Sequence, residues 1–205
     1  MFALVESGSI TKHLNGNKGI QIGDLKYPRA IYTLWTEAER NAINIYAVEY
    51  DDSNKKDEQW YINTNITYAF DGTNATGSYG TATAKSHADT LYTAQDETDG
   101  LGTEGEGRNR GLKYHLIQTV KVQAASELSR TDWYITRKSE ESTAIPSAIT
   151  THRRLVRSRQ AAMETAITNA SDTPALETLY TYVNTADEGD PIVMARPLAE
   201  IPTLD

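Results

Sequence analysis

The sequence contains no cysteine. Disulfide bonds, thiolate nucleophiles and cysteine-based metal sites are therefore excluded, and the absence fits a reducing compartment. No apolar run approaches about 18 residues, the length that a membrane-spanning helix needs. The N-terminal residues show no basic segment followed by an apolar one, so we expect no signal peptide.

Basic residues are scarce relative to acidic ones. The chain has 20 Lys and Arg against 28 Asp and Glu, which gives a formal net charge of −8. Phosphate backbones are bound by clustered positive charge, so this balance argues against a nucleic-acid partner. Without an apolar span, a membrane partner is not expected either.

The remaining composition is typical of a folded protein. The 205 residues are 39% hydrophobic and include 3 Trp and 12 Tyr, enough to form a core in one or two domains. Thr occurs 26 times, mostly in stretches that look extended, and β-branched residues favour strands. We therefore expect an α+β fold in which a small β-rich N-terminal domain with one or two short helices precedes a C-terminal helical bundle and an extended tail.

Residues 1–95 are predicted to be the β-rich domain, with a role in docking. The stretch FALVE reads as a strand, Ser7-Gly8 as a turn, and SITKH as a second strand that pairs back as a hairpin. Thr36 and Glu39 have the spacing of a capping box that opens a short helix. The strand expected at 44–50 is predicted to bury its tyrosine-rich face. This face consists of Tyr46, Val48 and Tyr50.

Two further elements are expected in this domain. Residues 59–70, QWYINTNITYAF, form the longest candidate strand. Residues 86–95 could form two or three helical turns. The next segment, 96–111, is rich in glycine and acids and is predicted to be a joint between the two halves.

The joint contains two motifs that resemble ligand sites. Gly100, Gly102 and Gly105 form a literal G-x-G-x-x-G, but no hydrophobic strand precedes it and the neighbouring acids would repel a pyrophosphate. The loop also aligns with a calcium loop, although the first position, Gln95, lacks the required carboxylate. A solvated acidic joint explains the segment better than either site. The calcium alignment uses Glu97, Asp99, Gly100 and Glu106.

Residues 112–189 are predicted to be helical. One stripe over 114–128 is apolar, and a short helix is expected to start near Asp132, with Trp133 buried as the plug of a small bundle. From about 148 to 170 an apolar seam repeats every seven residues; a neighbouring helix of the same chain is favoured as its cover, with copies of the chain as the alternative. The stripe comprises Leu116, Ile117, Val120, Ala124 and Leu128, and the seam comprises Ile149, Val156, Met163 and Ala170, with Ile167 beside it.

The C-terminal segments carry clear boundary signals. Asp172 is expected to cap another helix, with Pro174 in its first turn. Residues 190–205 contain three prolines and are predicted to be an extended arm that lies on a neighbouring surface.

No constellation of catalytic or metal-ligating residues emerges. The four histidines show no ligand spacing, and the sequence Ser86-His87-Ala88-Asp89 is not a triad, because adjacent side chains point in different directions. The basic run 151–159 is expected to be a solvated helix face that pairs with acids. We therefore expect no catalytic residues, no metal ligands and no cofactor. The histidines are His13, His87, His115 and His152, and the arginines placed on the solvated face are Arg153, Arg154 and Arg157.

Several motifs together resemble tailed-bacteriophage tail-fibre and tail-fibre-assembly proteins. The opening MFALVESGSITK, the Tyr27-Pro28 pair and NIYAVEYDD are similar to the N-terminal module of that group. The later TDWYITRK and AIPSAITTHRRLVRS are similar to its C-terminal helical segment, although this chain has His152 where the group has an aromatic residue.

The resemblance implies a non-enzymatic structural protein of a phage virion, made in the host cytoplasm and located in the tail, neck or fibre apparatus. Its partners would be other virion proteins and copies of itself. The alternative is a tail-fibre assembly chaperone that is absent from the mature particle. A glycan-modifying enzyme would need a pair of carboxylates in an aromatic cleft, and the sequence shows none.

Overall fold

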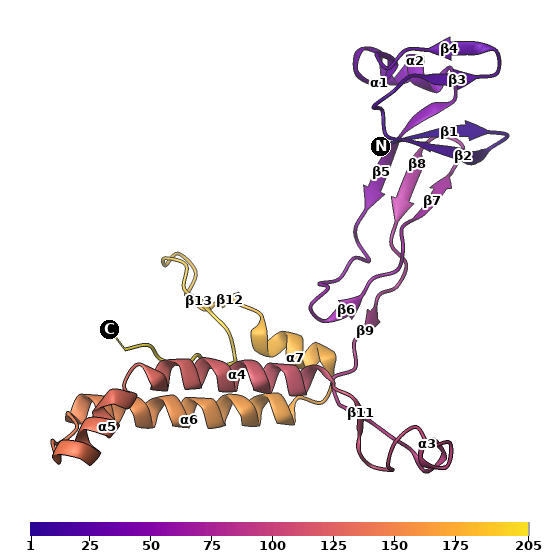
Figure 1. Cartoon of the computed structure of the whole chain (residues 1–205). Coiled ribbons are helices and arrows are strands. Elements are labelled where there is room, and N and C mark those ends of the chain that lie inside the picture. Colours follow the sequence, from indigo (N-terminus) through magenta and orange to yellow (C-terminus); the bar gives the residue numbers. More distant parts are fainter. Residues whose placement is uncertain (205) are drawn as a thin grey trace. The chain divides into compact units, whose positions relative to one another are not determined.

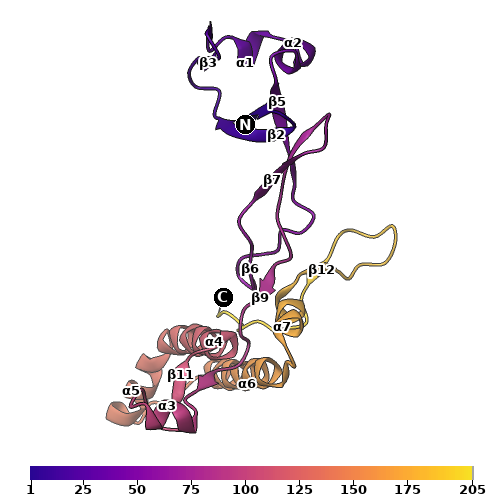
Figure 2. The same ribbon diagram turned by 90° about the vertical axis from the view of Figure 1, so that its right-hand side faces the viewer.

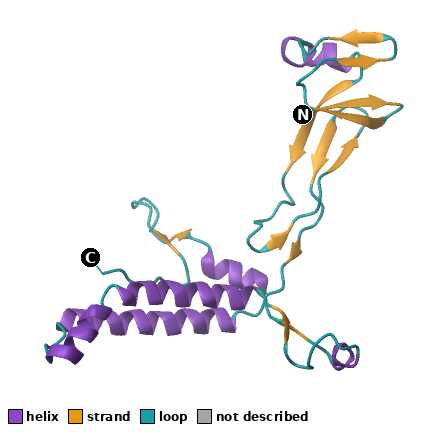
Figure 3. Cartoon of the chain, viewed as in Figure 1, coloured by secondary structure: helices purple, strands orange, loops and turns teal. Residues whose placement is uncertain are grey.

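The computed structural model describes residues 1–204 and has an α+β fold (Figures 1 and 3). Its strands are concentrated in an N-terminal unit, residues 1–83, and its long helices lie in a second unit that begins at residue 84. The boundary expected at residue 95 therefore falls inside the second unit. Each unit has its own core and is described separately.

The N-terminal hairpin forms where the sequence predicts it. Strands β1 (Phe2–Glu6) and β2 (Ser9–Leu14) pair antiparallel. Ser7 and Gly8 both have positive φ, 52° and 78°, which is the backbone pattern of the tight turns that join hairpin strands. The short polar or glycine residues at both positions make this turn possible.

The hairpin belongs to a five-stranded sheet with the order β2-β1-β5-β8-β7. Strand β5 (Ile45–Asp51) pairs antiparallel with β1 and parallel with β8 (Ala75–Ser78), and β7 (Thr67–Phe70) closes the other edge antiparallel to β8. Two-stranded ladders also form, from β3 (Ile20–Ile22) with β4 (Leu25–Tyr27) and from β6 (Tyr61–Ile62) with β9 (Thr83–Ala84).

The sheet carries one apolar cluster on each face, because successive residues of β1 point to opposite sides. Leu4 joins the larger cluster, which includes the short helix α1 (Ile31–Leu34), and Ala3 joins a smaller one. Helix α2 (Glu37–Asn41) begins with the predicted capping box between Thr36 and Glu39. The larger cluster comprises Leu4, Leu14, Ile20, Ile31, Tyr32 and Ile45, and the smaller one comprises Ala3, Val48 and Ala75.

Two strand predictions for this unit need correction. The face predicted to be buried in β5 is buried at Val48, and Tyr46 packs against the smaller cluster, but Tyr50 is exposed because it lies beyond the reach of either cluster. Ile45, on the opposite face, is fully buried. The stretch 59–70 does not form one long strand but divides into β6 and β7. Strand β6 ends just before Asn63. The Asn63 side-chain amide accepts a hydrogen bond from the N–H of Lys56 and donates one to its carbonyl. This local contact takes the place of strand pairing.

The second unit is built on two long helices that lie side by side, α4 (Leu112–Ser129) and α6 (Ser147–Asn169) (Figures 1 and 2). Val120 and Ala124 are buried on α4, as the predicted stripe requires. The predicted seam of α6 is buried along its whole length: Ile149, Val156, Met163, Ile167 and Ala170 are each less than 10% exposed. The cover of the seam thus comes from the same chain.

Smaller elements complete this unit. Helix α5 (Asp132–Glu141) joins the long pair at one end, and α7 (Thr173–Tyr180) follows α6. Asp172 caps α7 through the N–H of Ala175, and Pro174 lies in the first turn, as predicted.

The segment expected to be a helix and then a joint is folded differently. Strands β10 (Thr90–Leu91) and β11 (Gly107–Asn109) pair, and α3 (Ala94–Thr98) lies between them. The helix predicted for 86–95 is therefore wrong. Thr93 and Asp96 form a capping box for α3, which gives the acidic segment an ordered start.

The C-terminal arm returns to its own helices. Strands β12 (Val183–Asn184) and β13 (Met194–Ala195) form a short ribbon. Beyond it, Leu198 is 1% exposed and donates its N–H to the carbonyl of Leu179, and Leu204 contacts α4. The arm therefore lies on a neighbouring surface, as predicted, and that surface belongs to the helices of its own unit.

Trp133 is not the plug of the bundle. It is 51% exposed, and α5 contains no buried residue. The apolar stripes of α4 and α6 pack against each other, which leaves no interior position for α5. Trp133 instead stacks on Tyr134, with 3.8 Å between ring centroids, and the Arg137 guanidinium lies 4.7 Å from its ring.

We expect Trp133→Ala to lower the free energy of unfolding by less than about 1 kcal/mol, because only exposed ring and cation–π contacts are lost. Urea unfolding followed by circular dichroism of the helices would measure this. A loss of about 3 kcal/mol or more, typical of a core aromatic residue, would contradict the exposed position.

Candidate functional site

The motifs that resembled ligand sites serve the local structure of the segment between β10 and β11. Gly100 and Gly105 have φ of 72° and 82°, so they turn the chain. Glu97 accepts the backbone N–H of Glu104, and Asp99 accepts the amide of Gln95. Within residues 1–204, no group of three or more His, Asp or Glu side chains is arranged to hold a metal ion.

The Ser86–Asp89 stretch also serves the fold. Asp89 accepts the N–H of Gly111 at 2.8 Å and pairs with Arg110 at 2.5 Å. These two contacts, the backbone hydrogen bond first, hold the pKa of the Asp89 carboxyl below its usual range. Ser86 donates to the carbonyl of Ala88 and makes no contact with His87 that would suit a triad.

The histidines lie in different environments. His13 packs on the ring of Tyr68, with 4.3 Å between centroids, and His115 packs on Tyr114. His152 is buried and faces Glu127, with Nε2 3.0 Å from Oε1. The structure therefore brings none of the four histidines together.

The most developed polar arrangement is the Glu127 cluster, which we define as Glu127, Arg130, His152 and the backbone of Leu204. Glu127 comes from α4, and its carboxylate accepts from Arg130 at 3.0 Å and from the N–H of Leu204 at 2.8 Å. Arg130 in turn donates to the carbonyl of Leu204 at 3.0 Å. The cluster ties the end of the described chain to α4 and α6.

A second buried arrangement, the Arg153 cluster, lies beside it. Arg153 of α6 donates to the carbonyl of Leu128 at 2.7 Å and to Oγ1 of Thr131 at 2.6 Å, and pairs with Asp132 at 2.8 Å. The prediction that Arg153 lies on the solvated face is therefore wrong, whereas Arg154 and Arg157 are exposed as predicted. No sequence motif marked either cluster.

Both clusters have the chemistry of structural ties. The bonded groups in them are carboxylate, guanidinium, imidazole, hydroxyl and backbone groups of one compact unit. The only hydroxyl, that of Thr131, donates to the carbonyl of Leu128 and accepts from Arg153. A hydroxyl that acts as a nucleophile needs a neighbouring general base to accept its proton, whereas the Thr131 hydroxyl lies against the Arg153 guanidinium.

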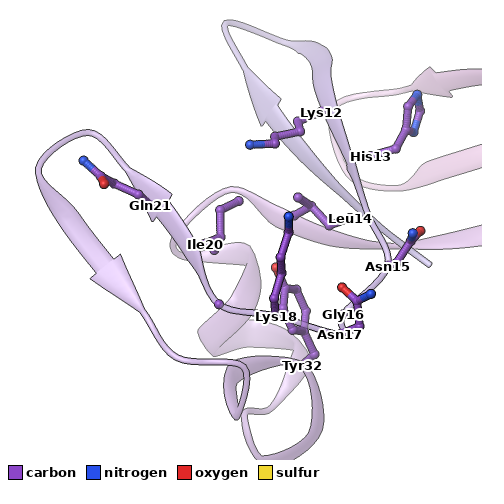
Figure 4. A pocket seen from close by; sticks show the side chains of 11 residues that line it. Lys12, His13, Leu14, Asn15, Gly16, Asn17, Lys18, Ile20, Gln21 and Tyr32 are labelled. Atoms are coloured by element: carbon purple, nitrogen blue, oxygen red, sulfur yellow. The ribbon is translucent and has the colours of Figure 1, made fainter.

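A pocket of about 520 Å³ with two lysines in its lining lies in the N-terminal unit (Figure 4). It is lined by residues 12–21 and by Tyr32. The side chains of Lys12 and Lys18 extend into the space between β2 and β3, and His13 points away from it (Figure 4). Leu14, Ile20 and Tyr32 belong to the larger apolar cluster beneath. We refer to this cavity as the lysine pocket.

The charges of the lysine pocket are not neutralised within the described chain. Neither Lys12 nor Lys18 forms an ion pair within residues 1–204. Two free ammonium groups over an apolar floor suit a ligand that combines carboxylates with an apolar group.

The second unit exposes an apolar surface on the β12–β13 ribbon, which we define as residues 182–195. Ile192 is 76% exposed, and its neighbours are about half exposed. The ribbon has only two strands, and isolated two-stranded ribbons are at best marginally stable in water. The large apolar side chains exposed on it are Tyr182, Val183, Ile192, Val193 and Met194.

No helix in residues 1–204 combines the length and the apolar run that crossing a bilayer requires. Comparison with known proteins assigns the chain to no family. No protein-family model, no curated protein and no solved structure matches it.

Proposed function

We propose that the chain is a non-enzymatic structural protein of a tailed-phage virion, in the tail, neck or fibre apparatus, that acts through protein–protein contacts. The observation that carries the contact role is the apolar surface of the β12–β13 ribbon. Contiguous exposed apolar groups mark interaction sites in soluble proteins. The virion assignment is supported by the tail-fibre-like motifs at residues 1–12, 44–52 and 131–158.

The geometry of the ribbon supports docking on another protein. Each of its strands pairs only with the other, so each has an edge with unpaired backbone groups. An extended partner can add to such an edge, while side chains such as Ile192 and Met194 enter apolar pockets. Burial on a partner would also remove the cost of leaving these side chains in water.

Quantitative mass spectrometry of washed particles tests this proposal. We expect a fixed, stoichiometric copy number of the chain relative to the capsid protein in particles of a phage that encodes it. The double variant Ile192→Asp, Met194→Asp should reduce incorporation about tenfold or more, because charge on a docking surface costs at least about 1.4 kcal/mol.

The matched control is the double variant Leu25→Asp, Leu34→Asp, which places the same two charges on apolar side chains that are 63% and 79% exposed in the N-terminal unit. This variant should enter particles normally. Absence of the wild-type chain from washed virions, with presence in infected cells, would contradict the virion role and support the assembly-chaperone alternative.

A further inference from the structure

The lysine pocket is preformed. Gly16 has φ of 68°, and a Cβ at this position would lie 3.4 Å from the ring of Tyr32. A Cβ at Gly19 would meet the carbonyl of Tyr27 at 2.4 Å. The loop between β2 and β3 is therefore pinned to its neighbours at both ends, which fixes the backbone from which Lys18 extends.

Lys12 is placed by strand geometry. Alternate residues of a strand share a face, so Lys12 lies on the face of β2 that carries the buried Leu14. The aliphatic stem of such a lysine lies along the apolar cluster while its ammonium group reaches the opening. The N-terminal unit is acidic as a whole, so the two unpaired lysines of the pocket form a positively charged patch on a negatively charged unit.

The chain carries a surface with the opposite properties, the acidic loop, which we define as residues 96–106. Leu101 at its centre is 57% exposed. The Glu104 and Glu106 side chains form no hydrogen bond or ion pair within residues 1–204. One exposed leucine flanked by free carboxylates is the complement of two ammonium groups above an apolar floor.

The acidic loop is also preformed. A Cβ at Gly102 would lie 2.5 Å from the ring of Tyr92, so the backbone at Gly102 packs directly against that ring, next to the exposed Leu101. Asp96 pairs with Arg108 at 3.0 Å and fixes the base of the loop. A surface that is already ordered loses little conformational entropy when it binds.

We propose that the lysine pocket receives the acidic loop of a second copy of the chain. Leu101 covers the apolar floor, and the carboxylates of Glu104 and Glu106 pair with Lys12 and Lys18. Since every chain carries both surfaces, two copies can exchange them reciprocally and close a dimer. This inference deepens the proposed function, because it names one partner of a protein that acts through protein contacts.

Charge exchange tests the pairing in the full-length chain. By sedimentation equilibrium at about 20 mM salt, we expect the wild type to dimerise, and to do so more weakly at about 0.5 M salt, where charges are screened within a few ångströms. Two double variants should each weaken dimerisation about tenfold or more, because like charges then face each other. One carries Lys12→Glu with Lys18→Glu, and the other carries Glu104→Lys with Glu106→Lys.

The two variants should associate with each other when mixed, because their charges are again complementary. A chain that carries all four substitutions should dimerise by itself. The control Lys121→Glu, Lys138→Glu changes the net charge equally at exposed lysines of α4 and α5 and should leave the association unchanged. Circular dichroism of each variant verifies that it is folded.

A wild-type chain that stays monomeric at about 0.5 mM protein in low salt, or mixed variants that fail to associate, would overturn the pairing. These outcomes are separate from the particle experiment. A monomeric chain found in washed virions would overturn the pairing and leave the proposed function intact. A charge-dependent dimer that is absent from virions would do the reverse.

Discussion

Replacing Arg153 with alanine is expected to lower the free energy of unfolding by about 3 kcal/mol. The side chain is 9% exposed, and it bonds the Leu128 carbonyl and the Thr131 hydroxyl where α4 ends. The last carbonyls of a helix have no partner within it, and a cation there also interacts favourably with the helix dipole. Removing the guanidinium breaks two buried charge-assisted hydrogen bonds and leaves the Thr131 oxygen without a donor, which costs more than the loss of an exposed contact. The Leu128 carbonyl keeps the hydroxyl and the N–H of Thr131 as donors.

The neighbouring Arg154 provides the matched control. It is exposed, so Arg154→Ala removes the same group at a cost within about 0.5 kcal/mol. Arg153→Lys should recover part of the loss, because the charge remains but the planar group that reaches several acceptors does not. Urea unfolding, followed by the circular dichroism signal of the helices, measures the free energy of unfolding of the second unit. A loss below about 1 kcal/mol for Arg153→Ala would show that water replaces the guanidinium.

The position of Arg153 illustrates what the sequence could have shown. Arg153 follows Ile149 by four residues and precedes Val156 by three, which is the spacing of residues that share a helix face. That spacing places it beside the apolar seam. Its charge and its offset from the centre of the seam predicted the solvated side. The burial of a residue at the edge of a seam depends on what packs next to it, and here the end of α4 supplies acceptors.

Local rules predicted most of the elements correctly. The Ser7-Gly8 turn, the Thr36–Glu39 capping box and the Asp172 cap each depend on residues a few positions apart, and all three form. The seam of α6 was also predicted, because its period is a property of one helix. A helix of the same chain is the favoured cover of the seam, but the sequence does not identify which one, because which stripes meet depends on tertiary packing. The same dependence explains the error at Trp133.

The polar ties could not be predicted because their members are far apart in sequence. Glu127 and His152 are 25 residues apart, and Glu127 and Leu204 are 77 apart. No periodicity relates such positions. The folding of the segment around the acidic loop cannot be predicted for a similar reason: Tyr92, which supports Gly102, is ten residues away, and local sequence alone places it in a helix.

The Glu127 cluster predicts a second large effect, on the attachment of the C-terminal arm. Burial by itself would raise the pKa of the Glu127 carboxyl, but hydrogen bonds from Arg130 and from the N–H of Leu204, with the charge of Arg130, lower the pKa below its usual range. The folded state therefore favours the carboxylate. Its contribution to stability is complete above the unfolded-state pKa of about 4.3 and is lost as the pH falls through the lower pKa of the folded state.

Glu127→Gln should accordingly lower the free energy of unfolding by about 2 kcal/mol at neutral pH, the range for hydrogen bonds to a charged group. The difference from wild type should shrink as the pH falls below about 4. Glu140→Gln removes an exposed carboxylate from α5 and serves as the control, with an expected change within about 0.5 kcal/mol.

Amide hydrogen exchange by NMR separates loss of the arm from general destabilisation. In Glu127→Gln the Leu204 N–H loses its charged acceptor, so it should exchange about tenfold faster or more. Leu198 keeps both its burial and its bond to Leu179, and its exchange should change only as much as global unfolding does. Equal acceleration at both amides, or none at Leu204, would show that Glu127 does not hold the arm in place.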